Sequence, residues 1–214
     1  DAAGWLQDLQ KAGKIRLVSG TNFNSRAVKA IVDAGIPLST LQVQYSVLDN
    51  RPEKKLAEFC REHGIKLLCY GTVAGGFLSE RWLGVPEPKP PFDNRSLVKY
   101  KLMIDEFGSW QTFQELLVAL KSVAVKHQAT ISNIAARWVL DRPQVGAAII
   151  GARTAAHLKD NLGVFDLELD AEDIRRIDVV LARRNGPPGD VFDIERIKEG
   201  PHGSIMKYNL NQVS

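Results

Sequence analysis

Short apolar segments alternate along this chain with longer segments in which apolar residues recur at every third or fourth position. The apolar segments span residues 15–19, 41–45, 65–70 and 145–150. Because each is too short for a helix, we expect strands there. The longer segments predict amphipathic helices between and after the strands. Strands that alternate with helices are typical of a parallel α/β sheet with right-handed crossovers.

Capping signals mark the ends of the predicted helices. Side chains that accept hydrogen bonds from a first helical turn precede several helices, and glycines follow others. The expected caps are Asn24 or Ser25, Ser109, Thr130, Thr154 and Asp170, and the expected stops are Gly13, Gly35, Gly64 and Gly163. The proline-rich stretch after Tyr70 and the tail at residues 185–214 predict irregular structure.

Chain length leaves two alternatives for the fold. A closed barrel of eight strands and eight helices typically takes about 250 residues. This chain has 214 residues, and its predicted strands suffice for about half of such a barrel. They are also enough for a small open sheet that shields its two edges. Composition and periodicity do not separate these alternatives.

Composition places the chain among ordinary globular proteins. Hydrophobic residues make up 44% and charged residues 25%, which excludes a fibrous or wholly disordered chain. The net charge of +3 gives no indication of nucleic-acid binding. No apolar run approaches the length of a membrane span, and no signal peptide is visible. The two cysteines exclude a disulfide framework and suit a reducing compartment, such as the cytoplasm or a plastid stroma.

Two strand ends carry residues that suit ligand binding. Thr21 and Asn22 follow the first strand, where a simple turn is the alternative interpretation. After the fourth strand, Gly151 and Arg153 precede a helix start. Backbone N–H groups and a guanidinium at such a position can receive a phosphate. The alternative there is a solvated surface arginine.

The third predicted strand ends on an aromatic residue and a glycine-rich loop. Tyr70 either stacks on a flat heterocycle or packs at the rim of the sheet, and the glycines after it let the backbone approach a ligand. Gln42 and Gln44 are expected to point into the same sheet cavity, where a ligand, each other or water would satisfy them. The four histidines show no metal-ligand spacing, and no Ser-His-Asp or Cys-His arrangement is evident, so we assign no metal and no catalytic residue.

These motifs follow one another in an order known from one enzyme family. The segments are Lys14-Ile15-Arg16, Gly20-Thr21-Asn22-Phe23, Gln42-Val43-Gln44-Tyr45-Ser46, Tyr70-Gly71-Thr72-Val73-Ala74-Gly75-Gly76, and Ile150-Gly151-Ala152-Arg153-Thr154 with Asn161. Any one of them is weak, but together and in this order they are specific. From about residue 5 to residue 184, the chain resembles the C-terminal half of an aldo-keto reductase.

The resemblance implies a fold and a cofactor. Residues 1–184 would form the second half of a (β/α)8 TIM barrel, followed by the irregular tail at 185–214. Members of this family bind NADPH in an extended form without a Rossmann domain. The resemblance assigns cofactor contacts to Thr21, Asn22, Gln42, Tyr70, Gly71, Thr72, Val73, Gly75, Leu78, Gly151, Arg153 and Asn161.

Each part of the cofactor has its own residues in this assignment. Thr21, Asn22 and Gln42 match positions that hold the nicotinamide carboxamide, and Tyr70 matches the aromatic residue stacked on the nicotinamide ring. Residues 71–78 match the pyrophosphate loop. Arg153 matches the contact to the 2′-phosphate, which favours NADP over NAD, and Asn161 matches an adenine contact. The chain departs from the family at Thr21, where Ser is frequent, and at His157, where Gln or Glu is frequent.

The catalytic part of the family's site has no counterpart here. Family members reduce carbonyls by hydride transfer and use a Tyr as general acid beside Lys, Asp and His. Those residues lie on the first four strands, upstream of Asp1, and no tyrosine of this chain takes the position of the acid. The resemblance thus implies a chain that is inactive alone and belongs to an enzyme that reduces aldehydes or ketones. Such a chain is either the back half of a longer reductase or one of two chains that complete the barrel. The alternative is a non-catalytic structural or NADP-sensing subunit of a larger assembly.

A half-barrel leaves two sheet edges and an inner face uncovered. We expect that inner face to be apolar, and an isolated monomer with such a surface is physically unfavourable. The expected partner is the other half-barrel or another protein that covers the edges. A small carbonyl substrate is expected if the assembled site is active, and neither nucleic acid nor membrane insertion is expected.

The Arg153 assignment gives a first test. Arg153→Ala should weaken NADPH binding more than NADH binding, because only NADPH carries the 2′-phosphate. Two fluorescence titrations measure the two affinities. Equal losses would rule out Arg153 as the phosphate ligand.

Overall fold

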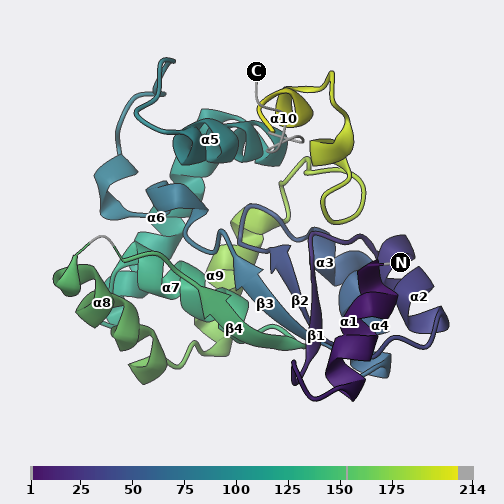
Figure 1. The fold of residues 1–214 in the computed structure, drawn as a ribbon. Coiled ribbons are helices and arrows are strands. Elements are labelled where there is room, and N and C mark those ends of the chain that lie inside the picture. Colours follow the sequence, from purple (N-terminus) through teal and green to yellow (C-terminus); the bar gives the residue numbers. More distant parts are fainter. Residues whose placement is uncertain (1, 153, 207–214) are drawn as a thin grey trace.

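A parallel four-stranded sheet forms the centre of the protein (Figure 1). The computed structural model describes residues 2–152 and 154–206. The strands β1 (Val18–Thr21), β2 (Leu38–Gln44), β3 (Lys66–Tyr70) and β4 (Val145–Ile149) lie side by side in chain order, each parallel to its neighbour. The predicted parallel α/β arrangement is confirmed. Its consequence for function is that all four strands end at the same side of the sheet.

Helices connect consecutive strands. Helix α1 (Ala2–Lys11) precedes β1, α2 (Ser25–Asp33) joins β1 to β2, and α3 (Arg51–Lys54) with α4 (Leu56–Glu62) joins β2 to β3. Three longer helices lie between β3 and β4, namely α5 (Arg95–Phe107), α6 (Trp110–Lys126) and α7 (Ile131–Leu140). After β4 come α8 (Ala155–Leu162), α9 (Ala171–Leu181) and the short α10 (Pro201–Ser204). Single 3-10 turns lie at Ala74–Gly76, Glu80–Trp82, Gly163–Asp166 and Ile194–Arg196.

The predicted helix caps are confirmed. Asn24, Ser109, Thr130, Thr154 and Asp170 each accept a hydrogen bond from a backbone N–H in the first turn of the helix that follows. Asp170 forms a full capping box with Asp173. Local side-chain chemistry therefore sets where these helices begin.

The tail predicted as irregular contains α10 and the 3-10 turn at Ile194–Arg196. Two further predictions of local structure are wrong. The first strand covers residues 18–21 and not 15–19, because its pairing with β2 begins at Val18 and leaves the apolar Leu17 exposed. The stretch after Tyr70 is not irregular throughout, since it contains α5. The Asn94 side chain caps α5, and the helix buries an apolar face made of Leu97, Tyr100, Met103, Ile104 and Phe107.

The two faces of the sheet have different surroundings. Leu41, Val43, Leu67 and Cys69 are fully buried on the face that packs against helices, including α4 and α7. The opposite face carries rows of residues set by the register of the strands. One row is Ser19, Thr40 and Lys66, the next is Thr21, Gln42, Leu68 and Ala147, and the last is Gln44, Tyr70 and Ile149. The inner face is therefore apolar only in part, because β1 and β2 place hydroxyl and amide side chains there, whereas β3 and β4 place Leu68, Ala147 and Ile149.

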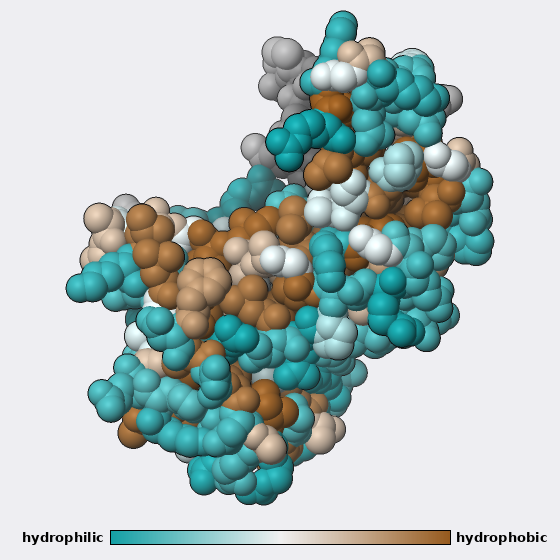
Figure 2. Space-filling view, turned by 90° about the horizontal axis from the view of Figure 1, so that it is seen from below, coloured by the Kyte–Doolittle hydropathy of each residue, from teal (hydrophilic) through white to brown (hydrophobic). Residues whose placement is uncertain are grey.

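Apolar side chains are also exposed at the two sheet edges. Beside β1, Trp5 on α1 is 70% exposed and Leu17 is 58% exposed. Beside β4, Leu158, Leu162 and Phe165 are exposed around an apolar groove that β4 itself lines. Seen from below, the molecule shows apolar surface running across its middle between hydrophilic margins (Figure 2).

A buried ion cluster fastens the tail to the sheet. Arg51, at the start of α3, donates from its guanidinium to both carboxylate oxygens of Asp49 and to both of Glu195 in the tail, at 2.7–2.9 Å. All three side chains are 1% exposed or less. Burial alone would raise the pKa of Glu195, but its hydrogen bonds with Arg51 hold the pKa below the usual value. The guanidinium thus neutralises two carboxylates that water does not reach.

Removal of Arg51 should destabilise the fold strongly. In Arg51→Ala, both carboxylates would stay buried without their partner, and the free energy of unfolding should fall by about 3 kcal/mol or more. Urea denaturation followed by circular dichroism measures this change. Arg183→Ala is the matched control, because Arg183 is an exposed arginine paired with one carboxylate, that of Glu115, and its loss should cost less than about 0.5 kcal/mol. Similar midpoints for the two variants would contradict the stabilising role of the cluster.

Candidate functional site

Four of the predicted site residues meet where β1, β2 and β3 end. Thr21 lies opposite Gln42 in the sheet, and its hydroxyl donates to the Gln42 side-chain oxygen at 3.3 Å. The Tyr70 hydroxyl donates to the Asn22 side-chain oxygen at 2.8 Å. Asn22 has a positive φ of 58°, a left-handed conformation that asparagine tolerates better than most residues. The structure therefore brings Thr21, Asn22, Gln42 and Tyr70 into one polar platform.

A lysine from α5 lies over the ring of Tyr70. The Lys99 ammonium is 4.8 Å from the Tyr70 ring centroid and 5.3 Å from that of Tyr100. Burial lowers the pKa of Lys99, although the charges of Glu195 and Asp49 act in the opposite direction. Burial likewise raises the pKa of Tyr70 and keeps its hydroxyl protonated. The platform thus offers neutral donors and one partly desolvated cation.

Tyr100 also explains two glycines of the loop after β3. Gly71 and Gly75 both have positive φ, and a Cβ on either would come within 2.7 Å of the Tyr100 side chain. Only glycine fits this close approach between loop and helix. The loop backbone is therefore held against α5, while the side chains of Thr72 and Leu78 point into the protein and are fully buried.

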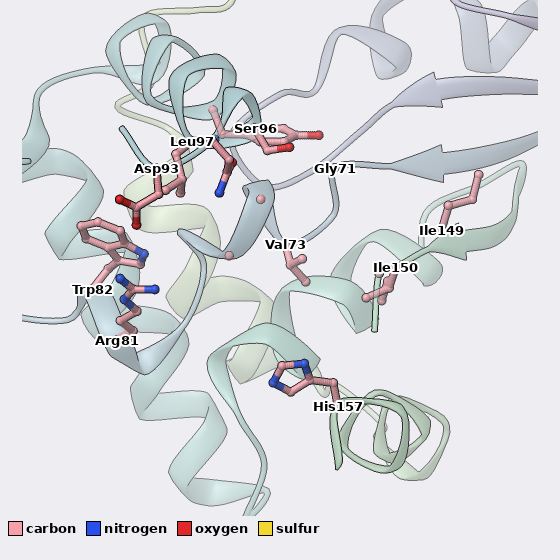
Figure 3. Close-up of a pocket in the computed structure, with 15 residues that line it drawn as sticks. Gly71, Val73, Arg81, Trp82, Asp93, Ser96, Leu97, Ile149, Ile150 and His157 are labelled. Carbon is pink, nitrogen blue, oxygen red and sulfur yellow. The ribbon is translucent and has the colours of Figure 1, made fainter. Parts of the chain in front are cut away.

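A cavity of about 820 Å³ opens beside this loop (Figure 3). This is a size typical of small-molecule sites. The cavity lies between the loop, the first turn of α5, the end of β4 and the start of α8. Its lining includes Gly71, Val73, Gly75, Gly76, Arg81, Trp82, Asp93, Ser96, Tyr100, Ile150, Gly151 and His157. Gly76 and Gly151 border open space, with no atom near the position of a Cβ. The backbone of each glycine is therefore accessible to a ligand in the cavity.

The predicted residues divide into three groups. Gly71, Val73, Gly75 and Gly151 line the cavity, and Thr21, Asn22, Gln42 and Tyr70 form the platform at the strand ends. Thr72 and Leu78 can contact a ligand only through their backbones. Asn161 lines the apolar groove beside β4 and not the cavity. Arg153 lies outside the described residues.

Sequence reasoning missed the contribution of α5. Ser96, Lys99 and Tyr100 on α5, and Asp93 just before it, border the cavity or the platform. From sequence, irregular structure is predicted for the stretch that contains them. A helical signal is present there. Asn94 is a good cap, and the apolar residues from Leu97 to Phe107 follow helical spacing.

Two classes of site are not found in the described part of the chain. Within residues 2–152 and 154–206, no group of three or more His, Cys, Asp or Glu side chains could hold a metal ion. Over the same residues, no helix is both long enough and apolar enough to cross a membrane.

Comparison with known proteins identifies the family. The model of the aldo/keto reductase family matches residues 1–182. The chain belongs to the aldo/keto reductase family. The resemblance predicted from the motifs is thereby confirmed at the level of the family, and so is the relation of this sheet to the barrel fold of aldo/keto reductases.

Related sequences match this chain at modest identity. The chain is 26% identical to aldo-keto reductase str7 of Strobilurus tenacellus over 190 residues, which cover 87% of this chain and 54% of that protein. It is 34% identical to flagellar radial spoke protein 5 of Chlamydomonas reinhardtii over 131 residues, which cover 60% of this chain and 25% of that protein. The chain thus spans about half the length, or less, of these curated relatives.

Solved aldo/keto reductase structures share the fold. The glycerol dehydrogenase AKR11B4 of Gluconobacter oxydans superposes with a TM-score of 0.73 at 25% identity, over 89% of this chain and 56% of that chain. An aldo/keto reductase of Klebsiella pneumoniae, solved in complex with NADP and acetate, gives a TM-score of 0.60 at 19% identity, over 86% of this chain and 54% of that chain. At that identity the second likeness concerns the fold alone.

Proposed function

We propose that this chain is the NADPH-binding half of an aldo-keto reductase-like oxidoreductase. Residues 1–184 would be the second half of the barrel, and the assembled enzyme would reduce aldehydes or ketones. The observation that carries the proposal is the adjacency of two features at the carboxyl ends of the strands. One is the amide and hydroxyl platform around Tyr70, and the other is a cavity whose walls expose glycine backbone.

The platform fits the nicotinamide end of the cofactor. Asn22 and Gln42 carry amide groups, which match the carboxamide of nicotinamide as both donor and acceptor. The Tyr70 hydroxyl donates a hydrogen bond to the Asn22 side-chain oxygen. The amide nitrogen of Asn22 is therefore the side-chain group left to donate to a ligand. The aromatic ring of Tyr70 provides the flat surface on which a heterocycle stacks.

The cavity fits the phosphate end. The Gly151 backbone borders open space, so its N–H can approach a phosphate oxygen closely, whereas the Gly76 N–H already donates to the Val73 backbone oxygen at 2.9 Å. Gly151 lies four residues before Ala155, the first residue of α8, and a helix start carries positive potential. A cofactor that lies along both features would run from the ends of β1 and β2, past the loop after β3, to the start of α8.

In this proposal the proton donor for the carbonyl lies on the first half of the barrel. Bound NADPH would supply hydride transfer to a carbonyl carbon, and the carbonyl oxygen then needs a proton from a nearby acid. The Tyr45 hydroxyl is buried and donates to Glu53, and the Tyr70 hydroxyl donates to Asn22, so both hydroxyl protons are already engaged. We therefore assign the acid to the first half of the barrel and propose that this chain alone is inactive.

The first half of the barrel is also the proposed binding partner of this chain. Parallel strands β1 and β4 each have an edge with no neighbour in the described sheet, and apolar side chains flank both edges. Strands of a first half-barrel would pair with these edges and cover Trp5, Leu17, Leu158 and Phe165. The partner would thereby complete both the core and the active site.

A non-catalytic role is the second candidate. The 34% identity to flagellar radial spoke protein 5 favours it, because that protein's name places it in a structural assembly. In this role the half-barrel would be a structural or NADP-sensing subunit. The two candidates differ in turnover, since both retain the cofactor platform but only the enzyme needs an acid beside it.

Cofactor binding is tested by filling the cavity. Gly151→Gln places a side chain in open space within the cavity wall and should weaken NADPH binding at least about tenfold, a change of ~1.4 kcal/mol. Gly4→Gln is the matched control, because Gly4 also faces open space but lies on α1. NADPH fluorescence titration of the full chain measures both. The absence of NADPH binding by the unmodified chain, or equal affinities of the two variants, would contradict the proposal.

The oligomeric state of the isolated chain tests whether it needs a partner. At micromolar concentration the full chain should scatter light as a species heavier than 23.7 kDa. Phe165→Lys, at the β4 edge, should reduce this association, whereas Val118→Lys on α6 should not, although both side chains are exposed. A monodisperse monomer of the unmodified chain would refute the prediction.

A further inference from the structure

The tail holds the loop that carries Asn22. The Arg196 guanidinium donates to the backbone oxygen of Asn22 at 2.7 Å. Asp193 accepts from the Asn24 side-chain amide at 2.9 Å, and Asp190 accepts from the Ser25 backbone N–H at 2.7 Å. In Figure 1 the tail, in yellow, lies above the ends of the strands. Residues 190–196, here called the clasp, thus contact three of four consecutive positions after β1.

The clasp acts on the residue whose conformation matters most to the platform. Asn22 stands in the left-handed region, which it can leave for a more favourable backbone conformation unless neighbours hold it. Its N–H bonds to the Gln42 backbone oxygen at 2.9 Å, and its side-chain oxygen accepts from Tyr70. Arg196 supplies the contact to the remaining backbone group, its carbonyl. The side-chain nitrogen of Asn22 is the group left to face a ligand.

The clasp is itself rigidly anchored. Glu195, next to Arg196, is bound to the buried Arg51, and the Asp193 carboxylate also accepts from the Asp190 backbone N–H at 2.9 Å. Asp193 has a lowered pKa, because hydrogen bonds from Asn24 and the Asp190 backbone outweigh the opposing effect of burial. A segment fixed on both sides transmits its position to the loop that it contacts.

We propose that Asp193 and Arg196 are positioning residues for the nicotinamide end of the cofactor. They act through Asn22 and not by contact with the ligand. This inference rests on the proposed NADPH site and adds that the tail, more than 160 residues away in sequence, sets the geometry of its carboxamide contact.

The test compares two ligands that share the adenosine end but differ in the nicotinamide end. NADPH contains the nicotinamide group, whereas adenosine 2′,5′-bisphosphate contains only the adenosine part with the 2′-phosphate. In the full chain, Arg196→Ala and Asp193→Ala should each weaken NADPH binding about fivefold and leave the affinity for adenosine 2′,5′-bisphosphate unchanged. Arg196→Lys should restore most of the NADPH affinity, because an ammonium also donates to a carbonyl. Arg183→Ala, an exposed arginine outside the clasp, should change neither affinity.

Each other outcome overturns a defined statement. Unchanged NADPH binding in both alanine variants would refute the positioning role and leave the proposed function intact. An equal loss for both ligands would show a general structural effect and also refute it. If the unmodified chain binds neither ligand, the proposed function fails, and this inference fails with it.

Discussion

The arrangement of this protein depends on a guanidinium that is shut off from water. The charge of Arg51 can be buried only because carboxylates surround it, since the free-energy cost of a buried unpaired charge is far higher than that of a paired one. Asp49 precedes Arg51 by two residues, but Glu195 belongs to the tail, 144 residues further along the sequence. The ion cluster therefore ties the tail to the end of β2. Since β2 also carries Gln42 and Gln44, the fastening point lies beside the proposed cofactor platform.

The platform draws on parts of the chain that are far apart in sequence. Asn22 follows β1, Tyr70 ends β3, Lys99 comes from α5 and Arg196 comes from the tail. None of these side chains is held by its own helix or strand alone. Their mutual geometry is a property of the assembled fold, which makes a local change in the tail able to alter the binding surface without a direct contact to the ligand.

The sequence allowed the prediction of features that depend on neighbouring residues. The caps at Asn24, Ser109, Thr130, Thr154 and Asp170 could be predicted because each acts within one turn of its own position. The meeting of the Thr21, Gln42 and Tyr70 strand ends followed from parallel pairing. The ion cluster and the clasp could not be predicted, since they join positions separated by more than 140 residues. The periodicity of a sequence indicates local structure and does not indicate contacts between such distant residues.

The composition of β4 has a consequence for how the protein must be produced. Its middle residues are Gly146, Ala147 and Ala148, so few side-chain atoms stand beside the backbone groups of the edge that has no neighbour among the described strands. Such an edge accepts almost any extended strand, which includes the β4 edge of another copy or a segment of an unfolded protein. A cell that makes this chain in excess over whatever covers β4 would accumulate aggregates. The supply of the covering segment, and not the stability of this domain, would then limit how much of the protein stays folded.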